Sequence, residues 1–160
     1  MYQRILLATD GSELSSILLA TDGSELSKKA VASGIALAAA LDAEIIAFNV
    51  VPQYPSMYFE GAVILTAEET GRIEKAWHQE AQALVNAVQE EANRQDVKAK
   101  AIAGSSADSV SKSIIAAAKK HHCDLIVMAS HGRKGIGRVL LGSETLDVLT
   151  HSHVPVLVLR

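Results

Sequence analysis

Short apolar runs alternate with helical patterns along this chain. The apolar runs cover residues 17–21, 44–51, 97–103, 124–129 and 154–159. The helical patterns cover residues 28–41, 67–95 and 106–121, and a short one begins near residue 143. Runs with few polar positions are typical of strands buried on both faces. Because such strands alternate with helices, we expect a doubly wound α/β fold: one open parallel sheet with helices on both faces.

A duplicated segment leaves open which residues form the first strand. ILLATDGSELS occupies residues 5–15 and occurs again, identical, at residues 17–27, with Ser16 between the copies. Two short copies do not make a repeat fold, and both cannot occupy one strand position. The second copy continues directly into the helical pattern of residues 28–41, so we expect it in the sheet and residues 1–16 outside the core. The opposite arrangement, with the second copy extruded between strand and helix, stays open. An exposed spare copy would be prone to pair with other chains.

Length and composition restrict the class of protein. The 160 residues, 49% of them apolar, predict a single globular domain over residues 1–160. The net charge of −3 gives no reason to expect a nucleic-acid partner. One cysteine, Cys123, excludes an internal disulfide and fits a reducing compartment. No apolar run is long enough to span a bilayer, and the first residues lack the pattern of a signal peptide. We therefore expect a cytoplasmic protein with no membrane partner.

The loop after the fourth apolar run has the residue types of a polyphosphate site. In open α/β sheets ligands bind beyond the carboxyl ends of the strands. Between Leu125 and Ser143 there are three cationic side chains and no acidic one: Arg133, Lys134 and Arg138. Three glycines in the same loop allow the backbone to approach a ligand closely: Gly132, Gly135 and Gly137. Each feature alone is also typical of a surface loop, but together they favour phosphate binding.

The end of this loop opens a helix at Gly142 and Ser143. The free N–H groups and the dipole at a helix N-terminus favour an anion. The hydroxyls of Ser143 and Thr145 add possible donors, although Ser143 also fits an ordinary N-cap.

The turn after the first strand has two interpretations. Asp22, with Glu25 three residues later, fits a capping box in its aspartate form. An aspartate at a strand end beside a triphosphate also suits a metal ion or a ribose hydroxyl. Both interpretations stay open.

Other nucleotide and metal motifs are absent from the sequence. No G-x-x-x-x-G-K-[ST] pattern occurs, and the first strand–helix turn has one glycine, which argues against NAD or FAD. His151 and His153 have no nearby cysteine or carboxylate cluster, so a structural role is favoured over metal binding. His131, inside the glycine-rich loop, is the histidine that remains a functional candidate.

Three segments of the chain resemble the universal stress protein family, whose fold is of the adenine-nucleotide alpha-hydrolase type. They are ILLATDGSELSKKAV at 17–31, CDLIVMASHGRKG at 123–135 and LLGSETLDVLTHSHVPVLVLR at 140–160. The resemblance implies a five-stranded parallel sheet in the order 3-2-1-4-5. The family's ATP-binding branch is marked by G-x2-G-x9-G-[ST], which aligns here as Ala129-x2-Gly132-x9-Gly142-Ser143. Alanine replaces the first glycine, and we expect this to weaken the fit without abolishing it.

The resemblance also implies roles for individual residues around a bound ATP with Mg²⁺. Asp22, beside Ala20 and Thr21, would face the ribose or the metal, and Val50 would pair with adenine through its backbone. Met128 and Ala129 would line the nucleoside. The phosphates would be held, largely by main-chain N–H groups, by Gly132, Arg133, Gly142, Ser143, Glu144 and Thr145.

The function that follows is an ATP-binding stress regulator in which ATP is a structural or signalling ligand. The resemblance implies a homodimer formed through the last strand, from Val154 to Leu159. No general base or nucleophile stands out near the phosphates, so we expect little or no enzymatic activity. One alternative is slow metal-dependent ATP hydrolysis with Asp22 and His131 taking part. A second alternative is a nucleotide-free dimeric interaction module.

Overall fold

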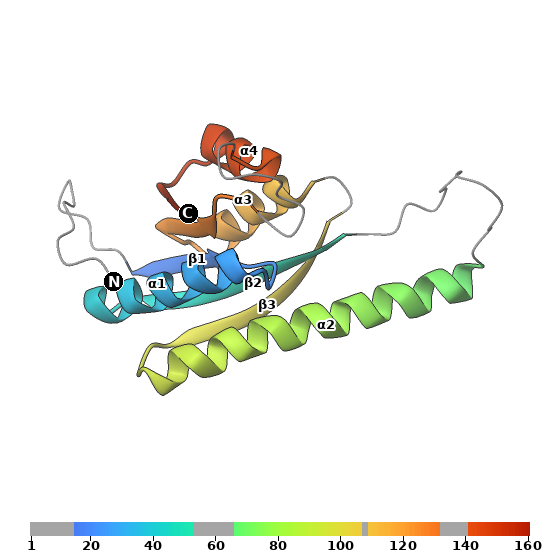
Figure 1. Cartoon of the computed structure of the whole chain (residues 1–160), viewed down its shortest axis with the longest axis horizontal. Coiled ribbons are helices and arrows are strands. Elements are labelled where there is room, and N and C mark those ends of the chain that lie inside the picture. The colour runs from blue at the N-terminus through green and yellow to red at the C-terminus, as the bar shows by residue number, and fades with distance from the viewer. Residues whose placement is uncertain (1–14, 53–65, 107–108, 132–140) are drawn as a thin grey trace.

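The computed structural model describes residues 15–52, 66–106, 109–131 and 141–160. Strands and helices alternate through these ranges, as Figure 1 shows. The strands are β1 (Ser16–Ala20), β2 (Glu44–Pro52), β3 (Ala99–Ser106), β4 (Leu125–Ala129) and β5 (Val156–Leu159). The helices are α1 (Glu25–Leu41), α2 (Ala67–Arg94), α3 (Val110–Lys120) and α4 (Ser143–His151).

All five strands form one parallel sheet in the order β3-β2-β1-β4-β5. This confirms the predicted fold class and strand order. β1 lies in the centre, where Ile17 is paired with Ile45 on one side and Leu125 on the other. The chain therefore winds outward from β1 in one direction and from β4 in the other, and the switch point lies between these two strands.

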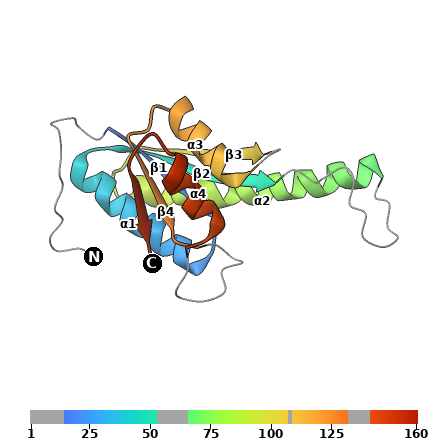
Figure 2. The ribbon, with the colours of Figure 1, turned by 90° about the horizontal axis from the view of Figure 1, so that it is seen from above.

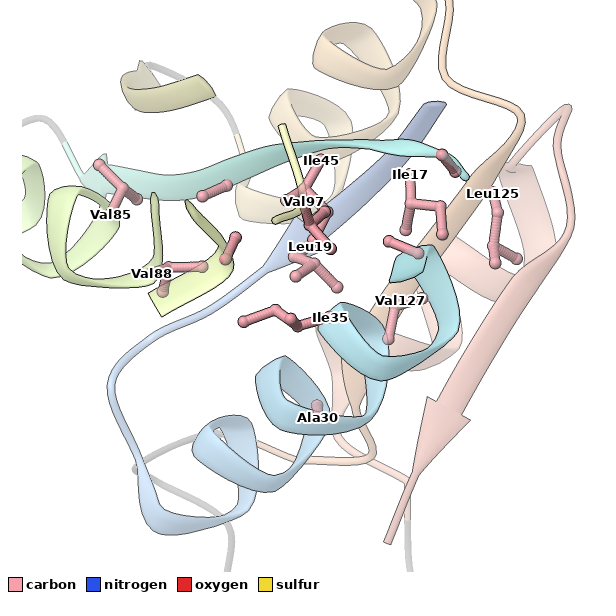
Figure 3. Packing of buried hydrophobic residues seen from close by; sticks show 14 of the residues in the cluster. Ile17, Leu19, Ala30, Ile35, Ile45, Val85, Val88, Val97, Leu125 and Val127 are labelled. Atoms are coloured by element: carbon pink, nitrogen blue, oxygen red, sulfur yellow. The ribbon is translucent and has the colours of Figure 1, made fainter. Parts of the chain in front are cut away.

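Two hydrophobic clusters cover the two faces of the sheet. Side chains of α1 and α2 pack on the face that carries Ile17 and Leu19, as Figure 3 shows. Side chains of α3 and α4 pack on the other face, which carries Leu18. Every residue of β1 and β4 is buried. Burial on both faces explains why these strands are nearly continuous apolar runs in the sequence.

The second copy of the duplicated segment forms β1, which begins at Ser16 and ends at Ala20. The first copy, apart from Ser15, lies outside the described residues. Its expected place as an extension of the domain therefore stays a prediction.

The described elements depart from the predicted boundaries mainly between β3 and α3. We expected α3 to begin at Ser106, but Ser106 ends β3 and α3 begins at Val110. β3 was expected to begin at Val97 and begins at Ala99. We expected this strand to end at Ala103, but it continues through Ser106 because β2 pairs with it as far as Pro52. The sequence Gly104-Ser105-Ser106 has no apolar pattern, so the backbone pairing, and not side-chain burial, extends the strand.

Helix α2 is longer than the sheet that it covers. Its 28 residues span about 42 Å at 1.5 Å per residue. Its buried residues, from Ala81 to Ala92, all lie in the C-terminal part, and Figures 1 and 2 show the N-terminal part extending past the sheet. A capping box between Thr66 and Glu69 stabilises that exposed end. Among the described residues no helix combines the length and apolar character needed to cross a membrane.

The carboxylate of Asp124 ties the start of β1 to the start of β4. One of its oxygens accepts hydrogen bonds from the backbone N–H groups of Ser15 (2.6 Å) and Ser16 (2.9 Å) and from the Ser15 hydroxyl (2.9 Å). Partial burial alone would raise the pKa of this carboxyl, but the three hydrogen bonds outweigh it and hold the pKa below its usual value.

Asp124→Ala is expected to lower the free energy of unfolding by about 2 kcal/mol at pH 7, because all three hydrogen bonds are lost. A depressed carboxyl pKa stabilises the folded state above the pKa of the unfolded chain. This stabilisation is lost as the pH falls through the folded-state pKa. Urea unfolding should therefore show a difference in the free energy of unfolding between wild type and Asp124→Ala that is smaller near pH 3 than at pH 7. An equal difference in the free energy of unfolding at both pH values would contradict this account.

Candidate functional site

The carboxyl ends of β1 and β4 lie side by side at the switch point of the sheet. The register that pairs Leu19 with Val127, continued by two residues, places Thr21 level with Ala129. The loops after both strands therefore leave the sheet at the same place. This is where open α/β sheets bind ligands.

The turn after β1 holds Asp22 at the strand end. Its Oδ1 accepts a hydrogen bond of 2.9 Å from the N–H of Ser24, and Gly23 between them takes a positive φ of 76°. Ser24 is the N-cap of α1, because its hydroxyl accepts a hydrogen bond from the N–H of Ser27. The capping-box interpretation of Asp22 and Glu25 is therefore wrong. Asp22 precedes the N-cap residue Ser24 by two residues and is half-buried beyond the carboxyl end of β1.

The first turn of α4 is fixed against the end of β4. The Gly142 N–H donates to the Ser130 carbonyl at 2.8 Å. The Thr145 hydroxyl donates to the Ala129 carbonyl at 3.1 Å, and Thr145 is buried. Thr145, which we expected to offer its hydroxyl to phosphate, instead uses that hydroxyl to hold the helix start in place.

The N-terminus of α4 differs from the other helix starts that the structure describes. Helices α1, α2 and α3 begin with side-chain caps, supplied by Ser24, Thr66 and Ser109. Helix α4 begins after Gly142, which makes no side-chain cap. Gly142 has φ −61°, a value that any residue can adopt, so backbone conformation does not require a glycine here. Gly142 has no side chain that could bond the first N–H groups of α4, and the positive end of a helix dipole favours an anion.

Three residues of the predicted nucleoside site lie on one face of the sheet, and Ala129 lies on the other. Ala20 and Met128 belong to the hydrophobic cluster under α3 and α4, and Val50 packs against it. Ala129 is buried on the opposite face, in the cluster under α1 and α2. Gly132 and Arg133 lie outside the described residues. The structure thus places Val50, Asp22 and the start of α4 at the carboxyl ends of three neighbouring strands, β2, β1 and β4.

Two residues of this edge were not singled out by the sequence analysis. The Asn49 amide donates to the Thr21 carbonyl at 2.6 Å and so joins the end of β2 to the end of β1. The Ser130 hydroxyl lies 3.1 Å from Nδ1 of His131. Asn49 could have been found, since it is the one polar side chain inside the apolar run of residues 45–51.

The described residues contain no cluster of three or more histidine, cysteine, aspartate or glutamate side chains that could hold a metal ion. Asp22 is a single carboxylate at the sheet edge. A single carboxylate suits Mg²⁺ that is held mainly by phosphate oxygens and water, which is the usual way in which Mg²⁺ binds with a nucleotide.

The edge of the sheet formed by β5 carries a groove lined by apolar side chains and by Arg160. Its lining includes Leu149 of α4 together with Val156 and Val158 of β5, and its volume is about 510 Å³. On α4, Leu146 is 55% exposed and Leu149 40% exposed. Beside an edge strand these side chains form an apolar surface that solvent reaches.

The sheet order and the switch point between β1 and β4 define a doubly wound α/β protein. The model of the universal stress protein family matches residues 15–160, and the chain belongs to this family. Universal stress protein MJ0531 of Methanocaldococcus jannaschii is 35% identical over 163 positions, which cover 100% of this chain and 83% of that protein.

Solved structures show the same fold. Universal stress protein UspA from Lactobacillus plantarum has a TM-score of 0.78 at 24% identity, covering 93% of this chain and 99% of its own. A universal stress protein in complex with cAMP has a TM-score of 0.58 at 23% identity, covering 92% of this chain and 97% of its own. The protein from Archaeoglobus fulgidus in complex with dAMP has a TM-score of 0.60 at 13% identity, with coverages of 93% and 100%.

Proposed function

We propose that this protein is an ATP-binding stress-response regulator of the cytoplasm, in which ATP acts as a structural or signalling ligand. The observation that carries the proposal is the start of α4. It has no side-chain cap, and it is held against the carboxyl end of β4 by the bonds from Gly142 and Thr145. Phosphates at this position would accept hydrogen bonds from the first N–H groups of α4 and would be stabilised by its dipole.

The remaining parts of the nucleotide have suitable neighbours along the same edge. Val50 is partly exposed and offers apolar surface for the nucleoside, whereas Ala20 and Met128 are buried in the same cluster and would contribute through the backbone at their strand ends. Asp22, which follows the end of β1, would face the ribose or would help to hold a Mg²⁺ ion bound with the nucleotide. Bound Mg²⁺ would neutralise phosphate charge, and Asp22 would orient it through a carboxylate oxygen.

Two further observations support a phosphorylated nucleoside over another anion. Structural neighbours of this chain were solved with cAMP and with dAMP. The loop between β4 and α4 also contributes three cations by sequence and no acidic residue: Arg133, Lys134 and Arg138. Three positive charges fit a triphosphate better than a monophosphate.

We further propose that two copies of the chain associate along β5. The predicted interface, Val154 to Leu159, includes the groove residues Val156 and Val158, which would be covered together with Leu149. Light scattering tests this: a mass of two chains is expected, and a mass of one chain at micromolar concentration would contradict it.

The test of nucleotide binding is thermal unfolding with and without ATP and Mg²⁺. At one hundred times the dissociation constant, ATP is expected to raise the melting temperature by about 5 °C or more. ATP with EDTA, and Mg²⁺ alone, are the controls for the role of the metal. Nucleotide-free purified protein that shows no shift would contradict ATP binding. ATP turnover above that of Asp22→Ala would indicate the hydrolase alternative instead.

A further inference from the structure

The first turns of α3 and α4 are joined through Ser111. The Glu144 carboxylate accepts a hydrogen bond of 2.7 Å from the Ser111 N–H. Asp147, one turn further along α4, accepts a hydrogen bond from the Ser111 hydroxyl. Ser111 is only 1% exposed, and Ser109 caps α3 through a different N–H, that of Lys112. Two carboxylates of α4 therefore face the N-terminus of α3.

Glu144 carries its charge in an unfavourable place for a protein that binds phosphate. It is the second residue of α4, directly after Ser143, in the turn whose N–H groups would hold the anion. A carboxylate in that turn competes with a phosphate for the same dipole and repels it. In the structure the carboxylate bonds instead to an N–H in the first turn of α3, at the positive end of a second helix dipole.

We propose that Glu144 sets how strongly this site discriminates among phosphate ligands by their charge, with the Ser111 N–H as the partner that holds its carboxylate. The proposal rests on the proposed nucleotide site. Glu144 is a positioning and specificity residue here: its backbone belongs to the anion-binding turn, and its side-chain charge opposes each added phosphate. The repulsion grows with the charge of the ligand, so it weakens ATP binding more than AMP binding.

The experiment compares ATP, ADP and AMP affinities by calorimetry for the wild type and three variants. Glu144→Gln keeps a side-chain oxygen that can accept from Ser111 and removes the charge. Glu144→Ala removes both the charge and the bond. Asp147→Asn is the matched control, because Asp147 contacts the same Ser111 from one turn further along α4.

Glu144→Gln is expected to bind ATP about five-fold more tightly, with AMP affinity changed less than about two-fold, so that the ratio of ATP to AMP affinity rises. The ratio of ATP to AMP affinity should also rise in Glu144→Ala, even if loss of the hydrogen bond weakens the binding of every nucleotide. The ratio should stay unchanged in Asp147→Asn. Higher salt should reduce the difference between Glu144→Gln and wild type.

The outcomes separate this inference from the proposed function. Wild-type protein that binds none of the three nucleotides overturns both. If the wild type binds ATP but the ratio of ATP to AMP affinity is unchanged in Glu144→Gln and Glu144→Ala, this inference alone is overturned. The hydrogen bond between Ser111 and Glu144 would then have a structural role only. An equal rise in Asp147→Asn also overturns it, because the effect would then belong to the net charge of α4 and not to Glu144.

Discussion

Leu18→Asp is expected to lower the free energy of unfolding by about 4 kcal/mol or more. Leu18 is fully buried in β1 and packs in the cluster under α3 and α4. Aspartate at this position loses the apolar contacts and places a charge among the apolar side chains of that cluster. Urea denaturation followed by circular dichroism measures the loss, and complete unfolding in buffer would agree with it.

Leu6→Asp is the matched control, because Leu6 is the same residue of the first copy of ILLATDGSELS. The second copy occupies β1, so Leu6→Asp is expected to change the free energy of unfolding by less than about 1 kcal/mol. If Leu18→Asp lowered the free energy of unfolding as little as Leu6→Asp, the first copy would be able to replace the second in the sheet. A severe loss from Leu6→Asp alone would show that the first copy contributes to the core.

Gly142→Asp is expected to stabilise the protein and to abolish ATP binding. The backbone of Gly142 suits any residue, and an added Cβ would lie 3.4 Å from its nearest neighbours, the Ser130 carbonyl oxygen and Cα of His131. Aspartate is a better N-cap than glycine, so its carboxylate would accept hydrogen bonds from the first N–H groups of α4 and add about 0.3 kcal/mol of stability. The same carboxylate would occupy and repel the phosphate position, and we expect at least about a hundred-fold loss of ATP affinity.

Two variants separate the parts of this effect. Gly142→Ala adds a Cβ without a cap, and we expect a small change in both stability and ATP affinity. Gly142→Asn adds a neutral cap, so it should stabilise the helix and weaken ATP binding less than aspartate does. Calorimetry measures the ATP affinity, and thermal unfolding measures the stability. Gly142→Asp that still binds ATP as tightly as the wild type would rule out the start of α4 as the phosphate site.

The fold was predictable because the strands of this sheet are chemically distinct from the helices. β1 and β4 are buried on both faces, so nearly every one of their positions is apolar in the sequence. β3 was predicted too short, because its last residues are held by backbone pairing with β2. Backbone hydrogen bonds between strands leave no side-chain pattern in the sequence.

The sequence predicted which residues belong to the candidate site better than it predicted the hydrogen bonds that these residues make. The sequence indicated Gly142, Thr145 and Asp22 as members of one site, and the structure brings the elements that carry them to one edge of the sheet. It did not indicate that Ser24 caps α1 or that the Thr145 hydroxyl donates to Ala129. Short polar side chains form these bonds according to local backbone geometry, which spacing alone does not specify.

The choice between the two copies of ILLATDGSELS belongs to the tertiary structure. The copies are identical, so residue type and periodicity within the segment determine that it supplies a strand and a turn but do not distinguish the copies. The helical pattern that follows the second copy favoured that copy and left the opposite arrangement open. With the second copy as β1, the turn to α1 contains only residues 21–24. Extruding that copy would lengthen the turn by twelve residues, cost about 1 kcal/mol in loop closure and expose a second apolar strand. Asp124 adds its hydrogen bonds to Ser15 and Ser16, so the contacts at the start of β1 and the short connection at its end distinguish two otherwise equal sequences.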